Sequence, residues 1–453
     1  MNINASIFKE YDVRGRYPEE LNPEIFKNIA QELTLNYNPE VVAIGRDIRE
    51  SSLSLQQGMI EGFIEQGVNV IDLGLVTTDM IYFAAGKFRY DLSIGITGSH
   101  VEGSNGFKIC KKGAVAITGN ELYKIRDSLI RREYFPQSLK KGEVVYKDIL
   151  KDWIDHALSF IDKNKIKAFK IVVDAGNGMG GLVMPPIEKE IPGHFFNLFF
   201  EMDGTFPNHF PNPLIFENLK FAIEKVKETK ADFGIIFDAD GDRVFLIDEN
   251  GKPLSGTVLT AMVAKNILRK NPNETILYNA VCGRIVPETI ESYGGKAIRV
   301  RVGHSIIKEK MRENNAIFAG EHSGHFYFRE NYFADSGLIA FLQALELISS
   351  DDRPLSKIAS DFQKYPQSGE INFKVEDKMA VMKLLEKEYD KKTNKIDWLD
   401  GISVWFPDWW FNVRPSNTES LLRLNIEADN EKILAQKINE LMDFLTSVGA
   451  VKN

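Results

Sequence analysis

Residues 41–74 read VVAIGRDIRESSLSLQQGMIEGFIEQGVNVIDLG, and this stretch decides the fold class of the chain. The β-rich runs 41–45 and 68–74 predict strands. Between them, the segment 52–66 places Leu53, Ile60, Phe63 and Ile64 close to one face of a helix. A strand, a helix and a strand in this order form a βαβ unit, so we expect a largely parallel sheet.

The same alternation recurs along most of the chain. Further apolar runs stand at 92–97, 114–118, 169–178, 231–248, 274–281, 296–303 and 316–320. They predict three successive α/β domains with mixed, largely parallel sheets. From about residue 366 the runs alternate as antiparallel strands do, and segment 431–449 is amphipathic, which predicts a smaller C-terminal α+β domain. The domains we expect are 1–148, 149–250, 251–365 and 366–453.

Composition excludes several classes of protein. A chain of 453 residues is too long for one core, and a net charge of -8 argues against broad nucleic-acid binding. No apolar stretch approaches the roughly 20 residues of a membrane helix. Two cysteines are too few for a disulfide framework, and the N-terminal residues lack a signal-peptide pattern. We therefore expect a cytoplasmic protein with no nucleic-acid or membrane partner. The sequence does not decide between a monomer and a dimer.

The loop DADGDR at 238–243 is the strongest local signal. Asp238, Asp240 and Asp242 alternate between two apolar strands, where their mutual repulsion favours a hard divalent cation such as Mg²⁺. Gly241 allows a tight turn, and Arg243 adds positive charge. An acidic hairpin turn without a metal is the alternative. An EF-hand is excluded, because Arg243 stands at the sixth position, where glycine is required, and strands flank the loop.

The loop RPSNTES at 414–420 indicates a phosphate site. Arg414 can donate a bidentate pair of hydrogen bonds, and Ser416, Asn417 and Thr418 offer side-chain donors. The alternative is a helix-capping box formed by Ser416 and Glu419. The segment 421–429 alternates like a strand, which favours the phosphate site.

Two further loops carry candidate chemistry. Ser99 stands among small polar residues after the apolar run 92–97 and is followed by His100 and Lys108, which makes it a candidate nucleophile. In GEHSGH at 320–325, Glu321, Ser323 and His325 are candidate ligands of sugar hydroxyls, and a solvent-facing turn is the alternative. Zinc is disfavoured there, because no cysteine or third histidine stands nearby.

One motif is a false signal. Residues 176–181 match G-x-G-x-x-G after a strand, as in dinucleotide-binding folds. We expect Pro185 and Pro186 to interrupt the helix that such a site needs, and therefore an interdomain turn instead.

These four loops, in this order, resemble those of the α-D-phosphohexomutase family, especially its phosphomannomutase/phosphoglucomutase branch. The resemblance extends to EYDVRGRY (10–17), DGTFPNHFPNP (203–213) and VGHSIIK (302–308). It implies four domains around a central cleft, each contributing one loop. It also implies a Mg²⁺-dependent phosphoserine enzyme that interconverts hexose 1-phosphate and hexose 6-phosphate, with a hexose 1,6-bisphosphate as activator and intermediate.

The resemblance assigns roles to individual residues. Ser99 corresponds to the phosphorylated serine and, with its phosphate, joins Asp238, Asp240 and Asp242 as a metal ligand. Glu321, Ser323 and His325 correspond to the sugar loop, and Arg414, Ser416, Asn417 and Thr418 to the phosphate loop. Supporting positions correspond to Tyr11, Arg14, His100, Lys108, Arg243 and His304. Lys108, His100, His304 and His325 are the candidates for accepting the proton of the attacking hydroxyl.

The chain departs from the family at several positions. Val101 and Glu102 replace Asn and Pro of the usual serine loop T-A-S-H-N-P, Val281 aligns with a frequent lysine, and His322 replaces a usual Met. These departures bear on rate and on the preferred sugar, mannose or glucose. They leave open a phosphosugar-binding protein with weak or lost activity. A phosphoglucosamine mutase is a further alternative, although that branch usually carries Gln at position 322.

Overall fold

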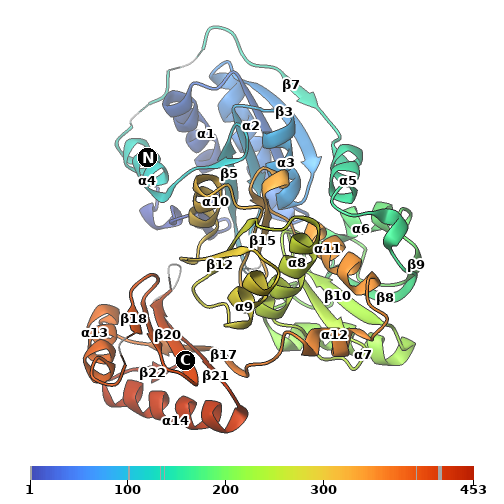
Figure 1. Ribbon diagram of the computed structural model, residues 1–453. Helices are drawn as coiled ribbons and strands as arrows, with labels where there is room; N and C mark the ends of the chain where they lie inside the picture. The colour runs from blue at the N-terminus through green and yellow to red at the C-terminus, as the bar shows by residue number, and fades with distance from the viewer. Residues whose placement is uncertain are drawn as a thin grey trace.

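The computed structural model describes residues 3–99, 101, 103–132, 134–136, 138–393, 395–416 and 421–453. Within these residues the chain forms four sheets, one for each of four consecutive domains (Figure 1). His100, Glu102, Asn417 and Thr418 lie outside the described residues.

The first domain carries a seven-stranded sheet in the order β1-β5-β4-β2-β3-β7, with β6 beside β5. The stretch 41–74 forms the expected unit, because β2 pairs in parallel with β3 and with β4. The strands are β1 (Val13–Arg16), β2 (Val41–Arg46), β3 (Asn69–Leu75), β4 (Leu92–Ile96), β5 (Ser104–Lys111), β6 (Val115–Ala116) and β7 (Val144–Tyr146). The helices are η1 (Ala5–Ile7), α1 (Pro23–Tyr37), α2 (Glu50–Glu65), α3 (Thr78–Lys87) and α4 (Gly119–Arg131).

The second domain has a four-stranded sheet in the order β11-β10-β8-β9. Its strands are β8 (Phe169–Asp174), β9 (Gly193–Leu198), β10 (Phe233–Phe237) and β11 (Val244–Asp248). Its helices are α5 (Leu150–Leu158), η2 (Lys163–Lys165), α6 (Gly180–Glu188), η3 (Phe216–Leu219) and α7 (Lys220–Thr229). Strands β8, β9 and β10 are parallel, whereas β10 and β11 form an antiparallel hairpin.

The expectation that two prolines interrupt a helix after residue 181 is wrong. Helix α6 contains both Pro185 and Pro186. The prolines lie on its half-buried side, while Val183, Met184 and Ile187 are buried in the core. Packing of that apolar face outweighs the lost backbone hydrogen bonds, as tertiary contacts commonly do for a short helix.

The third domain has a five-stranded sheet in the order β13-β12-β14-β15-β16. Its strands are β12 (Thr275–Asn279), β13 (Lys296–Val300), β14 (Phe318–Gly320), β15 (Phe326–Phe328) and β16 (Ala334–Asp335). Its helices are α8 (Gly256–Lys270), α9 (Ile285–Ser292), α10 (His304–Glu313), η4 (Arg329–Asn331), α11 (Gly337–Ser349) and α12 (Leu355–Ser360). Strands β13, β12 and β14 are parallel, and β15 and β16 are antiparallel additions.

The fourth domain has an antiparallel six-stranded sheet in the order β18-β19-β20-β21-β17-β22. Its strands are β17 (Gln367–Lys374), β18 (Lys395–Asp397), β19 (Ile402–Trp405), β20 (Trp409–Pro415), β21 (Leu421–Ala428) and β22 (Val451–Lys452). Its helices are α13 (Lys378–Tyr389) and α14 (Glu431–Ser447). The predicted fold class, three α/β domains followed by a smaller α+β domain, is confirmed.

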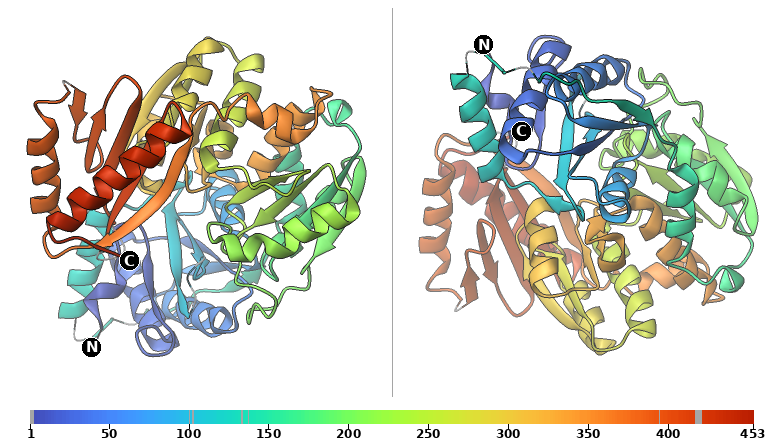
Figure 2. Two further views of the ribbon diagram at one scale, coloured as in Figure 1. Left: turned by 90° about the horizontal axis from the view of Figure 1, so that it is seen from below. Right: turned by 90° about the horizontal axis from the view of Figure 1, so that it is seen from above.

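The hydrophobic cores show how the domains are joined. One continuous core includes Leu73 of the first domain, Val173 of the second and Phe318 of the third. Helix α11 belongs to this core and is buried along its whole length. The fourth domain has a core of its own, which includes Phe411 and Leu441. It lies to one side, beside the third domain, in the views of Figures 1 and 2. None of the helices in the described ranges combines the length and hydropathy needed to cross a bilayer.

Candidate active site

Three carboxylates lie together in the loop between β10 and β11. Asp238, Asp240 and Asp242 are completely buried, and one oxygen of each lies within 4.8 Å of the others. Gly241 turns the loop with φ of 75°, and a Cβ atom there would lie 2.9 Å from Thr77 Cγ2. Glycine therefore provides both the backbone conformation and the close approach to the first domain.

Two buried cations partly neutralise these carboxylates. Lys108 Nζ lies 2.8 Å from Asp240 Oδ2 and 2.5 Å from Asp242 Oδ2, and Arg243 Nε lies 2.8 Å from Asp238 Oδ2. Burial would raise the pKa of Asp240, but the Lys108 ammonium holds it well below its usual range. Burial would lower the pKa of Lys108, and the two carboxylates raise it above its usual value. Burial raises the pKa of Asp238 to about 7.

The carboxylate cluster fits a divalent cation. Among the described residues, Asp240 Oδ1 and Asp242 Oδ1 are buried without a hydrogen-bond partner. Buried acceptors of this kind need a partner, and carboxylate oxygens are the ligands that Mg²⁺ prefers. Asp238, Asp240 and Asp242 are therefore the residues that would hold a metal.

Thr78 of the first domain orients the central carboxylate, a contact that sequence reasoning missed. Its hydroxyl donates to Asp240 Oδ2 over 2.6 Å, and its backbone N–H donates to the Asp240 carbonyl over 2.9 Å. Thr78 is the first residue of α3, directly after β3 and a short connection. The sequence offered one signal for this contact: polar residues stand shortly after β3, and the ends of parallel strands commonly carry site residues.

Ser99 stands just beyond the end of β4 and is buried, with 3% of its surface exposed. Its φ is 50°, in the left-handed region that serine seldom adopts. Its N–H donates to Thr97 Oγ1 over 2.8 Å, and its carbonyl accepts a hydrogen bond from Arg49. Arg49 was not predicted from the sequence. The adjacent His100 lies outside the described residues.

The sugar loop connects β14 with β15. Glu321 accepts hydrogen bonds from Tyr327 over 2.6 Å, from Ser323 over 3.1 Å and from Asn279 over 3.4 Å. Gly324 closes the turn with φ of 90°. These donors fix the orientation of the Glu321 carboxylate before any ligand binds.

His325 links the sugar loop to the carboxylate cluster. Its Nδ1 lies 3.0 Å from Asp335 Oδ2 and 4.0 Å from Asp242 Oδ1. Burial would lower the pKa of His325, but Asp242 and Asp335 raise it. Asp335 is also paired with the buried Lys308 at 2.8 Å. Asp335 and Lys308 were not among the predicted site residues, because only the fold brings them to His325.

His304 and Tyr11 join the first domain to the third. Their rings meet edge to face at 5.3 Å, and the Tyr11 hydroxyl donates to the Val302 carbonyl over 3.5 Å. Burial holds the pKa of His304 well below its usual value, so this imidazole is neutral. Arg14 is paired with Asp12 at 2.7 Å.

The fourth domain presents Arg414 near the end of β20. The side chain is buried, and its Nη2 lies 3.0 Å from Glu370 Oε2. Among the described residues, Arg414 Nε has no hydrogen-bond partner. Burial lowers the pKa of Arg414, and Glu370 opposes this shift. The next predicted residue, Ser416, is buried, whereas Asn417 and Thr418 lie outside the described residues. After them the chain continues as strand β21, and not as a helix.

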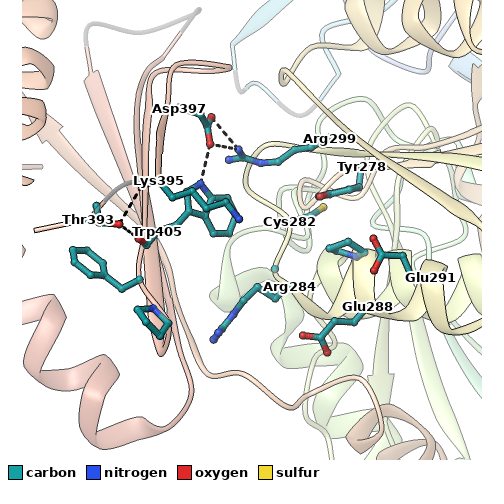
Figure 3. A pocket seen from close by; sticks show the side chains of 14 residues that line it. Tyr278, Cys282, Arg284, Glu288, Glu291, Arg299, Thr393, Lys395, Asp397 and Trp405 are labelled. Atoms are coloured by element: carbon teal, nitrogen blue, oxygen red, sulfur yellow. Dashed lines mark hydrogen bonds and ion pairs between the residues drawn. The ribbon is translucent and has the colours of Figure 1, made fainter. Parts of the chain in front are cut away.

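A cavity of about 740 Å³ opens between the third and fourth domains (Figure 3). Arg299 of β13 reaches toward the fourth domain and lies 2.9 Å from Asp397 Oδ2, and its guanidinium lies 4.9 Å from the centre of the Trp405 ring. None of the described site residues lines this cavity. The predicted site residues within the described ranges therefore lie outside this interdomain cavity.

Side-chain and backbone contacts connect predicted residues of three domains. Lys108 joins the first domain to the carboxylates of the second, and Arg243 of the second domain forms a backbone bridge with His325 of the third. Arg414 contacts Glu370 within its own domain, and Arg14 contacts Asp12 within its own.

Known proteins resemble this chain over nearly its whole length. Residues 5–134, 151–251 and 255–365 match "Phosphoglucomutase/phosphomannomutase, alpha/beta/alpha domain" I, II and III, and residues 370–443 match the C-terminal domain of the same group. The phosphomannomutase of Methanocaldococcus jannaschii is 38% identical over 98% of each chain. The phosphohexose mutases of Xanthomonas campestris are 38% identical over 96% of this chain and 98% of theirs. A crystal structure of a phosphoglucomutase/phosphomannomutase family protein from Burkholderia thailandensis superposes with a TM-score of 0.90, 29% identity and 99% coverage of each chain.

Proposed function

This chain belongs to the phosphoglucomutase/phosphomannomutase family, and from that premise we propose that it interconverts hexose 1-phosphates and hexose 6-phosphates, of mannose or glucose, through phosphorylated Ser99. Members of the family are isomerases, and so is this enzyme. The observation that carries the proposal is the buried cluster of Asp238, Asp240 and Asp242, which Lys108 of the first domain and His325 of the third domain both approach.

The chemistry begins with a phosphoryl group on Ser99 Oγ. A hydroxyl oxygen of the bound hexose phosphate attacks this phosphorus, the bond from phosphorus to Ser99 Oγ breaks, and a hexose bisphosphate results. Such transfer depends mainly on positioning and on electrostatic stabilisation. A Mg²⁺ ion held by Asp238, Asp240 and Asp242 would supply positive charge for the developing negative charge. Lys108 and Arg243, both buried beside the carboxylates, add to the positive charge of the site.

The attacking hydroxyl must lose its proton. Lys108 is engaged by two carboxylates that favour its charged form, which makes it a poor base. His304 is neutral, so its imidazole can form a hydrogen bond with the substrate. His325 is oriented by Asp335 through Nδ1, so proton exchange with a sugar hydroxyl falls to Nε2. Two candidates for the base therefore remain within the described residues. His304 is already neutral, and His325 is oriented by Asp335, although Asp242 and Asp335 favour its charged form.

The two orientations of the sugar share one set of contacts. Glu321, held by Tyr327 and Ser323, accepts hydrogen bonds from ring hydroxyls, and Arg414 binds the phosphate that is not reacting. After the bisphosphate has turned, its other phosphoryl group returns to Ser99 Oγ and the isomeric monophosphate is released. Arg414 receives a phosphate in either orientation.

Intact-mass measurement with peptide mapping tests the proposal. After incubation with glucose 1,6-bisphosphate and Mg²⁺, we expect one added phosphoryl group on Ser99, and none on a Ser99→Ala variant. The same variant should lose at least about 1,000-fold in isomerisation rate, as expected for a removed nucleophile. Assays with mannose, glucose and glucosamine phosphates then identify the sugar. Binding of the bisphosphate without phosphorylation or turnover would instead identify a phosphosugar-binding protein.

A further inference from the structure

Ser99 is held in an uncommon backbone conformation by a buried side chain outside the predicted site. The φ of 50° at this serine needs support, because a residue with a side chain is strained in the left-handed region. On the N-terminal side the Ser99 N–H donates to Thr97. On the C-terminal side the Ser99 carbonyl accepts from Arg49 Nη2. A charged donor to a buried carbonyl is among the stronger hydrogen bonds in proteins.

Arg49 is itself fixed by its own domain. It is 7% exposed, and its Nη1 donates to Asp47 Oδ2. Asp47 Oδ1 accepts from the Arg49 N–H over 3.1 Å and from Ser52 over 2.5 Å. The Asp47 N–H in turn donates to the carbonyl of Ile96, at the end of β4. Asp47 and the Arg49 guanidinium together thus connect the start of α2, the end of β4 and the Ser99 loop.

The second domain closes over the same guanidinium. The Phe206 ring centre lies 5.1 Å from the guanidinium carbon of Arg49, a cation–π distance. The backbone of Phe206 is itself in the left-handed region, with φ of 49°. The backbone at Gly204 lies so close that a Cβ atom there would be 2.7 Å from Arg49 Cα. The loop that carries Phe206 is therefore packed directly on Arg49.

The Ser99 loop leaves room for this arginine. A Cβ atom at Gly98 would lie 2.9 Å from Arg49 Nε and 2.2 Å from the carbonyl oxygen of Ser104. No larger residue fits at position 98 unless the loop or Arg49 moves. The geometry of the loop and the placement of Arg49 are therefore mutually dependent.

We propose that Arg49 is a positioning residue for phosphoryl transfer at Ser99, held by Asp47 and by the Phe206 ring of the second domain. The guanidinium fixes the peptide after Ser99, and with it the direction of the Cα–Cβ bond that carries the nucleophilic oxygen. Phosphoryl transfer depends on an in-line approach, so a small reorientation of that bond slows the reaction. The catalytic part of this inference rests on the proposed function. The part that says Arg49 fixes the conformation of the Ser99 loop does not.

The first test measures the loop without any chemistry. Arg49→Lys keeps the charge but loses the planar fork that reaches Asp47 and Ser99 together. Hydrogen–deuterium exchange of peptides that cover residues 97–101 should become about tenfold faster in this variant. Arg132→Lys is the matched control, because Arg132 in the same domain also joins a carboxylate, Glu32, and a ring, Phe135. Unchanged exchange in Arg49→Lys, or equal acceleration in Arg132→Lys, overturns the proposal.

The second test measures phosphoryl transfer. In single-turnover loading from glucose 1,6-bisphosphate, Arg49→Lys should phosphorylate Ser99 about 10- to 100-fold more slowly. The bisphosphate Kd should stay within about twofold, since Arg49 acts through Ser99 and not on the sugar. Phe206→Leu should slow loading by a smaller factor and should add nothing in the Arg49→Lys background, because both act through one guanidinium.

The outcomes separate the two proposals. Loading at the wild-type rate in Arg49→Lys overturns the role of Arg49. Parallel losses of rate, affinity and melting temperature in Arg49→Lys and Arg132→Lys also overturn it, because they indicate general destabilisation. If the wild-type protein itself takes no phosphate, the proposed function fails, and the exchange result alone decides whether Arg49 holds the Ser99 loop.

Discussion

Lys108 and Asp240 are 132 residues apart in the chain, yet the Lys108 ammonium lies 2.8 Å from Asp240 Oδ2, where the first and second domains meet. Both side chains are almost fully buried. The pair joins the strand that follows the Ser99 loop to the carboxylate cluster. The position of Ser99, the proposed nucleophile, relative to the three carboxylates that we propose hold the metal therefore depends on an interdomain ion pair.

Replacing Lys108 by Met should destabilise the protein strongly in the absence of metal. Loss of one partner of a buried ion pair typically costs about 3–5 kcal/mol, because the remaining charge is left uncompensated. Mg²⁺ should restore part of that loss, since the cation compensates the same carboxylates. Denaturant unfolding of both proteins, with EDTA and with Mg²⁺, measures the difference. An equal loss in both conditions would show that no cation binds at this cluster.

Replacing Thr78 by Val should weaken metal binding while the fold persists. The Thr78 hydroxyl holds Asp240 Oδ2, and groups that orient a metal ligand commonly contribute about 10-fold or more to affinity. We expect about a 10-fold rise in the Mg²⁺ concentration that gives half-maximal activity. Thr229→Val removes a hydroxyl that donates to the Lys225 carbonyl on α7, and it should leave that concentration unchanged. Identical Mg²⁺ titrations of the Thr78 variant and the wild type would contradict the assigned role.

Replacing Tyr327 by Phe should impair sugar binding. The Tyr327 hydroxyl donates to Glu321 over 2.6 Å, and loss of a hydrogen bond to a buried charged group costs about 1.5–3 kcal/mol. A less constrained Glu321 should raise KM about 10-fold or more. Steady-state kinetics with hexose 6-phosphate provide the measurement. A fall in kcat at unchanged KM would mean that Glu321 does not bind the ground-state sugar.

Replacing Glu370 by Gln should strengthen phosphate binding by the fourth domain. Glu370 lies 3.0 Å from Arg414 Nη2 and would compete for this donor with the phosphate that we propose Arg414 binds. The Glu370 side chain is 31% exposed, so its pairing with Arg414 contributes about 1 kcal/mol or less. We expect the Kd for hexose phosphate to fall about two- to fivefold, measured by calorimetry. Weaker binding would show instead that Glu370 is needed to orient Arg414.

The pair of His209 and Asp174 predicts a pH dependence of stability. His209 Nε2 lies 3.1 Å from both Asp174 oxygens, and its ring packs against the rings of Phe199 and Phe221. Burial would lower the pKa of His209, but Asp174 raises it above its usual value. The pair therefore stabilises the fold fully below about pH 6.5, and this contribution is lost as the pH rises through the raised pKa.

Melting temperatures across pH 5.5–9 test this expectation against a His209→Gln variant. The stability difference between wild type and variant should be largest at the acidic end and should shrink as the pH rises. A difference that stays constant with pH would mean that the pKa of His209 is the same in the folded and unfolded states, so that Asp174 does not raise it.

Much of the fold followed from local pattern. The βαβ order of residues 41–74 led to β2, α2 and β3, because apolar periodicity reports which face of each element is buried. Helix α6 was missed, since Pro185 and Pro186 are unfavourable in an isolated helix and only the core contacts of Val183, Met184 and Ile187 compensate.

The sequence by itself determined the order of the four loops, the spacing of the three aspartates and the candidate nucleophile Ser99, since each of these is a property of adjacent residues. The tertiary structure alone decided which side chains support them. Thr78 on Asp240, Asp335 on His325, Glu370 on Arg414 and Arg49 on Ser99 are contacts across 10 to 162 residues. Such partners depend on how sheets and domains pack. The free energy that holds the sheets and domains in this arrangement comes from burial of the whole core, which no local stretch of sequence specifies.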